Sequence, residues 1–163
     1  MSSVRVIRLF LWGTVFVYFL VLVKFLILDR ITYSGIGARL FNVYPFHSIK
    51  QYILNRDSYN FNTWAMNLFG NLFMLFPYGV LLPMLFKQMR RAFRFLVSLI
   101  GFNLFIEVFQ YLTMLGSFDV DDMILNSTGA VAGYLFSTSL LTIPLIKQLL
   151  DQSAARKEGD LPI

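Results

Sequence analysis

The chain has no cysteine and little charge: of its 163 residues, only 14% are Asp, Glu, Lys or Arg. The lack of cysteine excludes disulfide bonds, thiolate nucleophiles, iron–sulfur clusters and zinc–thiolate sites. The low charge stands against 57% apolar residues and a mean hydropathy of +0.65, which excludes a water-soluble globule. The same shortage of charge argues against nucleic-acid binding in spite of a net charge of +5. We therefore expect an integral membrane protein.

Long apolar runs predict the fold class: an all-α, polytopic membrane protein with a single transmembrane domain over residues 1–163. About 20 consecutive apolar residues are enough to cross a bilayer. We expect four transmembrane helices, at about residues 9–28, 64–86, 93–115 and 122–146. A mixed polar and aromatic loop over residues 29–63 follows the first helix. The tail, residues 147–163, is expected to continue the fourth helix and then fray.

The 29–63 loop also contains a helical pattern. Phe46, Ile49 and Ile53 recur at helical spacing directly after Pro45, which favours the start of a helix. We expect a short interfacial helix here that lies on the membrane surface. Within the second transmembrane helix, Pro77 removes a backbone donor and predicts a bend.

Basic residues are unevenly distributed between the two sides of the predicted bundle. The first side, which includes both termini, holds nine, and the second side, with the 29–63 loop, holds four. They are Arg5, Arg8, Lys87, Arg90, Arg91, Arg94, Lys147, Arg156 and Lys157 on the first side, and Arg30, Arg39, Lys50 and Arg56 on the second. The positive-inside rule therefore predicts that both termini are cytoplasmic and that the 29–63 loop is external.

Polar residues of three predicted helices lie at one depth, roughly 5 to 12 Å below the external boundary. Within each helix they are three or four residues apart and share a face. We therefore expect an outer-leaflet polar pocket with the loop around Pro45 as its lid. The candidate ligand-binding residues are Asn67, Asn71, Glu107, Gln110, Asp119, Asp122 and Asn126, with Pro45, Phe46 and His47 from the loop.

Two explanations compete for these residues. Asn and Gln commonly join transmembrane helices through hydrogen bonds alone. Glu107 is different, because an ionised carboxylate in this zone costs about 2–3 kcal/mol or more unless it is paired, protonated or hydrated. We therefore expect a functional role for Glu107 and Gln110. In the acidic turn, Asp121 or Asp122 is expected to cap the fourth helix.

The remaining features leave alternatives open. The acidic and amide side chains form an all-oxygen set that suits Mg²⁺ or Ca²⁺, but their spacing matches no metal loop, and we expect no cofactor. No nucleophile lies beside a base, so no catalytic residues are predicted. Small residues at Gly129, Gly133 and Ser137 allow close approach of a helix, either within the chain or between subunits, so the oligomeric state stays open.

Several motifs together resemble the VanZ-like family of small bacterial membrane proteins, over about residues 40–137. They are Asn42-Val43-Tyr44-Pro45-Phe46, Asn67-Leu68-Phe69-Gly70-Asn71, Phe76-Pro77-Tyr78-Gly79, Glu107-Val108-Phe109-Gln110, and Asp119-Val120-Asp121-Asp122 with Asn126, Gly129 and Gly133. The resemblance implies a multi-pass protein of the bacterial cytoplasmic membrane, and the founding member is linked to lowered susceptibility to teicoplanin. Many members carry Gly-Arg before the acidic turn, where this chain has Gly116-Ser117, so another basic residue of the loop, Arg39, Lys50 or Arg56, would neutralise the acids.

Three functions are compatible with these features. The first is a non-enzymatic protein that binds a lipid-linked cell-envelope component or a lipoglycopeptide antibiotic and contributes to teicoplanin-type resistance. The second is a membrane enzyme that acts on a lipid headgroup, with Glu107 as base or metal ligand. The third is a structural helper whose polar residues only hold the helices together. The expected partners are membrane lipids or lipid-linked envelope precursors, and possible binding of the antibiotic itself belongs to the first function.

Overall fold

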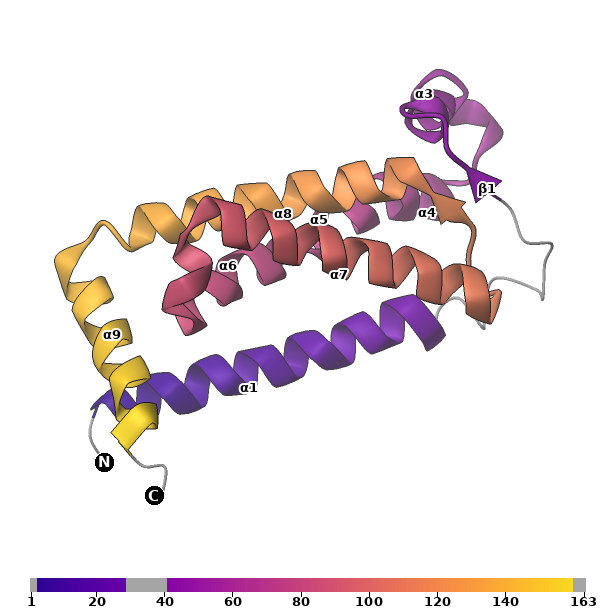
Figure 1. Ribbon diagram of the computed structural model, residues 1–163. Coiled ribbons are helices and arrows are strands. Elements are labelled where there is room, and N and C mark those ends of the chain that lie inside the picture. The colour runs from indigo at the N-terminus through magenta and orange to yellow at the C-terminus, as the bar shows by residue number, and fades with distance from the viewer. Residues whose placement is uncertain (1–2, 29–40, 160–163) are drawn as a thin grey trace.

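The computed structural model describes residues 3–28 and 41–159, and it shows a bundle of long helices whose two chain ends lie at the same end (Figure 1). Three stretches are long and apolar enough to cross a membrane: Leu9–Ile27, Phe61–Leu85 and Ala92–Thr113. A fourth, Val120–Leu140, passes the same test together with Pro144–Asp151, to which it is bent by 101°. The expected all-α membrane architecture is confirmed, with three spans or four.

The first helix, α1 (Ser3–Val23), continues into a π-helical stretch, Lys24–Leu28. Only 11% of its apolar window is buried within the protein, so most of its surface is available to lipid. Tyr18 anchors it to the bundle, because its hydroxyl donates a hydrogen bond to the backbone oxygen of Met74, 2.9 Å away.

The second span is interrupted at Leu75, two residues before Pro77, and the bend expected at Pro77 stays a prediction. It consists of α4 (Phe61–Ala65), a π-helical stretch (Met66–Gly70), α5 (Asn71–Met74) and α6 (Phe76–Leu85). Leu75 separates α5 from α6, and Pro77 lies in the first turn of α6. Because proline has no N–H, it fits the start of a helix better than its interior.

The third span is α7 (Ala92–Thr113), and a two-residue strand, β2 (Phe118–Asp119), leads from it into α8 (Val120–Leu140). The small residues of α8 pack against the second span. A Cβ atom on Gly129 would lie 1.7 Å from the backbone oxygen of Leu72, and one on Gly133 would lie 2.2 Å from that of Phe76. The predicted close approach is therefore made within the chain, between α8 and α5–α6.

The expected fourth helix corresponds to α8, but its expected end at residue 146 and the tail that continues it are wrong. α8 ends at Leu140, and α9 (Pro144–Gly159) begins after a short turn and runs at 101° to it (Figure 1). The physical reason is Pro144, which cannot donate to a carbonyl of the preceding turn but is well suited to begin a helix.

α9 is held against the 87–90 turn by charge. Arg90 donates a hydrogen bond from Nη1 to Oδ1 of Asp151 at 2.7 Å, and Nζ of Lys87 lies 3.7 Å from the same oxygen. Desolvation raises the pKa of Asp151, but the hydrogen bond from Arg90 and the nearby positive charges outweigh it, so the pKa of Asp151 is lowered.

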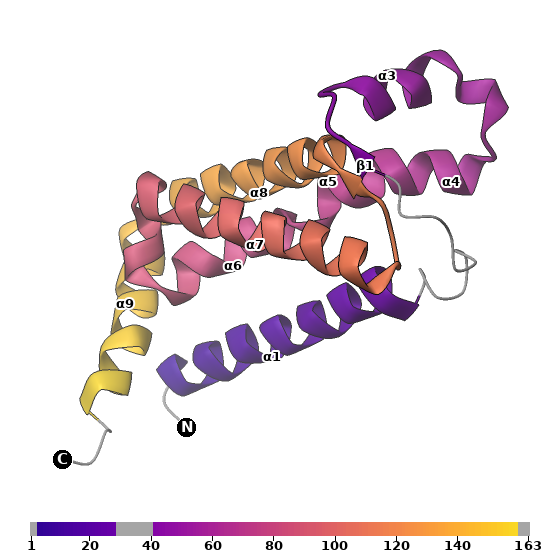
Figure 2. The same cartoon turned by 45° about the vertical axis from the view of Figure 1, so that its right-hand side comes forward.

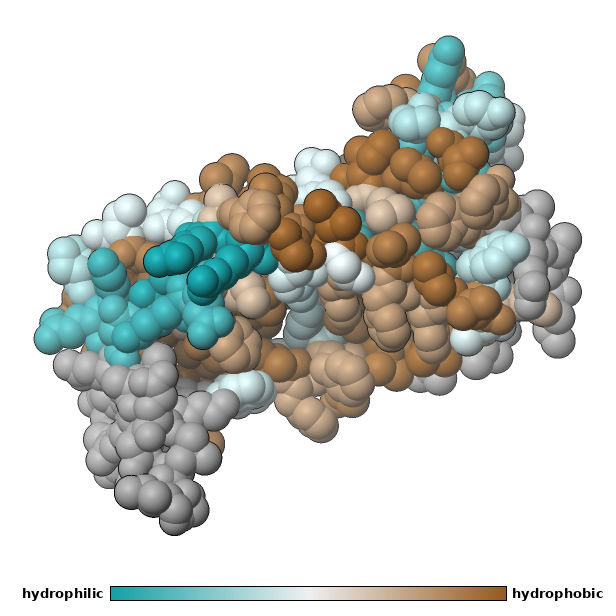
Figure 3. All heavy atoms as spheres, viewed as in Figure 1, coloured by the Kyte–Doolittle hydropathy of each residue, from teal (hydrophilic) through white to brown (hydrophobic). Residues whose placement is uncertain are grey.

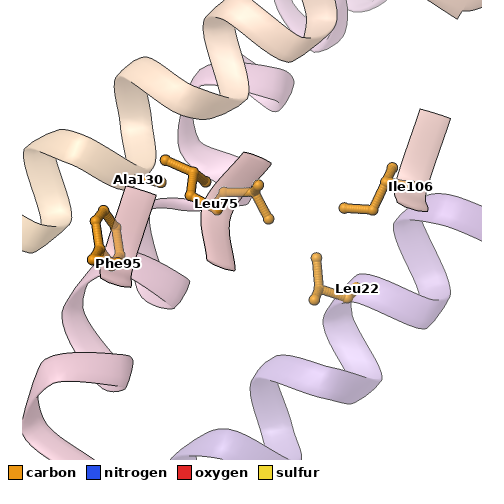
Figure 4. Close-up of a cluster of buried hydrophobic side chains, with 6 residues drawn as sticks. Leu22, Leu75, Phe95, Ile106 and Ala130 are labelled. Carbon is orange, nitrogen blue, oxygen red and sulfur yellow. The ribbon is translucent and has the colours of Figure 1, made fainter. Parts of the chain in front are cut away.

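The main core lies where α1, the second span, α7 and α8 meet. Its buried side chains are Leu22, Leu75, Phe95, Leu99, Ile106 and Ala130, most of which Figure 4 labels. On the face drawn in Figure 3, apolar residues cover the middle of the bundle, and hydrophilic residues gather near the end that holds α9 and on the projecting segment at the other end. This distribution is typical of a protein whose solvent is lipid.

Candidate functional site

The predicted site residues lie at the end of the bundle opposite α9, where a projecting segment joins the bundle. We call residues 41–60 the α3 arm: strand β1 (Phe41–Asn42), α3 (His47–Leu54) and a 3₁₀ turn (Arg56–Ser58). β1 pairs in parallel with β2, so that Asn42 lies opposite Asp119. In Figure 2 the arm projects beyond the start of α8 and returns along α4.

Asp119 joins the arm to α8 and caps that helix. Its Oδ1 accepts hydrogen bonds from the backbone N–H of Asp121 at 2.9 Å and from Nδ2 of Asn42 at 2.9 Å. Its Oδ2 accepts the hydroxyl of Ser48 at 2.6 Å. The expectation that Asp121 or Asp122 caps the fourth helix is therefore wrong, because Asp119 is the N-cap residue.

Asp121 caps α3 instead, from a position more than 70 residues later in the chain. Its carboxylate is fully buried, and its two oxygens accept the backbone N–H groups of Phe46 at 2.5 Å and Ile49 at 3.1 Å. Phe46 is the N-cap residue of α3 and Ile49 lies in its first turn, where no carbonyl of the same helix is available to these N–H groups. The negative charge also lies at the positive end of the helix dipole.

The helices below the arm contribute further polar contacts. Glu107, which is buried on α7, accepts the backbone N–H of Asp119 through Oε2 at 3.1 Å. Asn71, which is buried on α5, donates a hydrogen bond to Oδ1 of Asp122. Side chains from α5 and α7 therefore contact the start of α8, next to the carboxylates that hold the arm, and Glu107 and Asp122 belong to this polar cluster.

The deeper amides are also buried. Asn126 has no exposed surface, and Gln110 is only 3% exposed and lies beside Gly116. Asn103 is not among the predicted site residues, although it lies four residues before Glu107 and so shares its face of α7. It is fully buried, and its Nδ2 lies 2.9 Å from both the backbone oxygen of Met123 and Oγ of Ser127 on α8.

Of the other predicted site residues, Asn67 and Phe46 contact this cluster through their backbone: the oxygen of Asn67 accepts Nδ2 of Asn71 at 3.1 Å, and the N–H of Phe46 donates to Asp121. Asn67 is half-buried, and its Nδ2 donates to the backbone oxygen of Thr63 in the same span. Pro45, Phe46 and His47 are exposed, and Nε2 of His47 lies 3.1 Å from Nε2 of Gln51. That these side chains form a lid over the cluster stays a prediction.

The structure places two of the three loop residues, Arg56 and Lys50, that are expected to neutralise the acids. The guanidinium of Arg56 lies over the Trp64 ring, 4.6 Å from its centroid, and donates to the backbone oxygen of Tyr59. Lys50 is exposed on α3, and Arg39, like Arg30, lies outside the described residues. N–H and O–H donors, rather than basic side chains, make the contacts described above with Asp119 and Asp121.

The cluster attaches the arm to the bundle. We call the hydrogen bonds that Asp119 and Asp121 accept from the arm the clasp. Within residues 3–28 and 41–159, no group of three or more His, Cys, Asp or Glu side chains is arranged to hold a metal ion. The carboxylates of Asp119 and Asp121 are instead occupied by donors from the arm and from the start of α8. Their arrangement fixes the position of the α3 arm on the bundle.

Comparison with known proteins places the chain in a family context. The family model for VanZ/LLP1 matches residues 11–142, which is most of the chain and includes the arm, the polar cluster and all of α8. Comparison with curated proteins and comparison with solved structures gave no match.

Proposed function

The chain belongs to the VanZ/LLP1 family, as its motifs predict, and we propose that it is a ligand-binding protein of the bacterial plasma membrane rather than an enzyme. Its ligand is amphipathic: a lipid-linked cell-envelope component or a lipoglycopeptide antibiotic. By binding it at the outer membrane surface, the protein contributes to resistance against teicoplanin-type glycopeptides.

The observation that carries this proposal is the attachment of the α3 arm through buried carboxylates. A loop needs no such attachment if it only connects two spans, since loops of this length are commonly held weakly. Here Asp119 and Asp121 together accept hydrogen bonds from Asn42, Phe46, Ser48 and Ile49. The attachment supports a role in which the arm must be presented in one orientation.

The exposed face of the arm has the chemistry of a surface for amphipathic molecules. Tyr44 is 74% exposed, Ile53 62% and Leu54 68%, although none of them belongs to a membrane span. Lys50 is exposed on the same helix. Apolar side chains beside a cation complement an acyl chain attached to an anionic or amide-rich headgroup. The ligand therefore meets the exposed face of the arm, and the buried cluster holds that face in place.

The orientation follows from charge. In the proposed topology both termini are cytoplasmic, and the α3 arm faces the outside, where cell-wall precursors and glycopeptides are found. Lys87, Arg90 and Arg91 lie between the second and third spans at the α9 end, and Arg94 lies in the first turn of the third span. Asp119, Asp121 and Asp122 lie at the arm end. This asymmetry agrees with the positive-inside rule.

A structural-helper function is the second candidate, and one observation favours it. The carboxylates of Asp119 and Asp121 are used for contacts within the chain, as expected if the polar residues only hold helices together. The two candidates differ in what the exposed face does. A structural helper tolerates changes of Lys50, whereas a ligand-binding arm does not.

The test is the susceptibility to teicoplanin of a sensitive bacterial host without its own VanZ-like protein. The host carries the wild type, Asp121→Asn, Lys50→Glu or the control Asp57→Asn at equal membrane levels. Asp57 is an exposed acid of the arm with no part in the clasp. We expect protection from the wild type and Asp57→Asn, and its loss in the other two. Full protection by Lys50→Glu contradicts binding on the exposed face, and no protection by the wild type contradicts the resistance role.

A further inference from the structure

Two fully buried amides, Asn103 on α7 and Asn126 on α8, have side-chain atoms without a hydrogen-bond partner. Asn103 and Asn126 are both 0% exposed. Within the described residues, Oδ1 of Asn103 and both Oδ1 and Nδ2 of Asn126 make no hydrogen bond. Buried polar side-chain atoms are paired in the large majority of cases, often by ordered water, because an unpaired one carries the full cost of its desolvation.

Asn103 contacts the turn of α8 that contains Asn126. Nδ2 of Asn103 reaches the backbone oxygen of Met123 and Oγ of Ser127, and Asn126 lies between these two residues in the helix. Asn103 is ten residues before the end of α7 at Thr113, so it lies about 15 Å below that end, close to the middle of a bilayer. Lipid cannot supply a hydrogen bond at this depth.

The donor or acceptor character of the three unpaired atoms indicates which kind of molecule can pair with them. The contacts of Asn103 fix its amide orientation, because Nδ2 must face the carbonyl of Met123, and its free atom is therefore an acceptor. Asn126 offers one acceptor and one donor in either orientation of its amide. A cation would pair only with the acceptors, and an anion only with the donor. Water both donates and accepts hydrogen bonds, so it suits all three atoms.

We propose that Asn103 and Asn126 form an internal binding site for water near the middle of the membrane. The site lies at the deep end of a polar stripe on α7, below Glu107 and Gln110, which are 1% and 3% exposed. This proposal is independent of the ligand on the α3 arm. The failure of either one leaves the other standing.

A direct measurement is the magnetisation transfer between water and the side-chain amide protons of Asn126, by NMR in deuterated detergent micelles. The Asn126→Val variant assigns the signal by removing it. We expect a cross-peak to water for Asn126, with the negative sign of a bound, slowly tumbling molecule. A side-chain signal of Asn126 that shows no transfer from water overturns the proposal.

Thermal unfolding gives a second test that also separates water from a dry site. If a water molecule bridges the two amides, Asn126→Val removes one of the groups that hold this water, so Oδ1 of Asn103 loses its hydrogen bond. We then expect the Tm to fall by about 2–6 °C. The double variant Asn103→Val and Asn126→Val then loses less than the sum of the single variants. In a dry site, Asn126→Val removes two unpaired atoms and raises the Tm, which contradicts the proposal. Asn67→Val is the matched control, and its effect should add to that of Asn103→Val.

A bound cation is the remaining outcome. Replacing sodium chloride with choline chloride at constant ionic strength should leave the wild-type Tm unchanged. A saturable rise of the Tm with sodium or potassium that Asn126→Val abolishes would assign the site to a metal cation and overturn the assignment to water.

Discussion

Replacing Asp121 with Asn tests how the α3 arm is held. The carboxylate accepts two backbone N–H groups, from Phe46 and Ile49, with one oxygen each. An amide of the same shape keeps one oxygen, but it directs its NH₂ group at the second N–H. The variant therefore loses one hydrogen bond, places two donors against each other and removes the negative charge from the start of α3.

The magnitude follows from the loss of one charge-assisted bond at a buried site. Such a bond contributes about 1.5–3 kcal/mol. Because Asp121 contacts the arm and does not belong to the hydrophobic core, this loss falls on the local opening of the arm. An opening equilibrium shifted by that free energy increases roughly 10- to 150-fold.

Hydrogen–deuterium exchange in detergent or nanodiscs measures this opening residue by residue. We expect the amides of residues 46–54 to exchange roughly 10- to 150-fold faster in Asp121→Asn, while those of α7 and α8 keep their protection. Asp57→Asn, an exposed change in the same arm, should leave the exchange of α3 as in the wild type. Unchanged exchange of α3 in Asp121→Asn would refute the clasp.

Three further predictions concern packing, charge and topology. Gly129→Ala should lower stability to heat by about 1–3 kcal/mol, because its Cβ would lie 1.7 Å from a backbone oxygen of the second span, whereas Gly101→Ala, with nothing within 4 Å, should be neutral or stabilising. Glu107→Gln should keep both the fold and the protection against teicoplanin, since its amide oxygen still accepts the backbone N–H of Asp119. Glu107→Ala should lose about 1–3 kcal/mol of stability, and loss of protection in Glu107→Gln would contradict a purely positioning role of this side chain. An impermeant thiol reagent should label Ser58→Cys but not Ser153→Cys in intact cells, and labelling at residue 153 would invert the topology.

Local patterns in the sequence predict much of the bundle. The apolar runs identify the spans, and Pro77 marks the interruption of the second one. The small side chains at Gly129 and Gly133 correctly indicate a close helix contact. The end of α8 was also readable in principle, because Pro144 begins a helix more readily than it continues one.

The contacts of the candidate site are harder to predict because they join distant parts of the chain. Nothing near Asp121 in the sequence indicates that its carboxylate caps a helix more than 70 residues earlier. The hydrophobic pattern of the sequence also does not predict that the two-residue strands pair at Asn42 and Asp119, because a strand pattern is recognised only over longer segments. Asn103 is not among the predicted site residues, but it could have been found from a local pattern. It lies four residues before Glu107 and therefore on the same face of α7.

The most direct test of the proposed function is photo-crosslinking from the exposed face of the arm in living cells. A benzophenone amino acid replaces Ile53, which is 62% exposed on α3, or Phe105, which is 62% exposed on α7 within a span. Mass spectrometry then identifies the adducts. We predict a lipid-linked envelope component or teicoplanin at Ile53 but only bulk phospholipid at Phe105, with the Ile53 adduct lost when Asp121→Asn is added. The same phospholipid adducts at both positions would contradict ligand binding by the α3 arm.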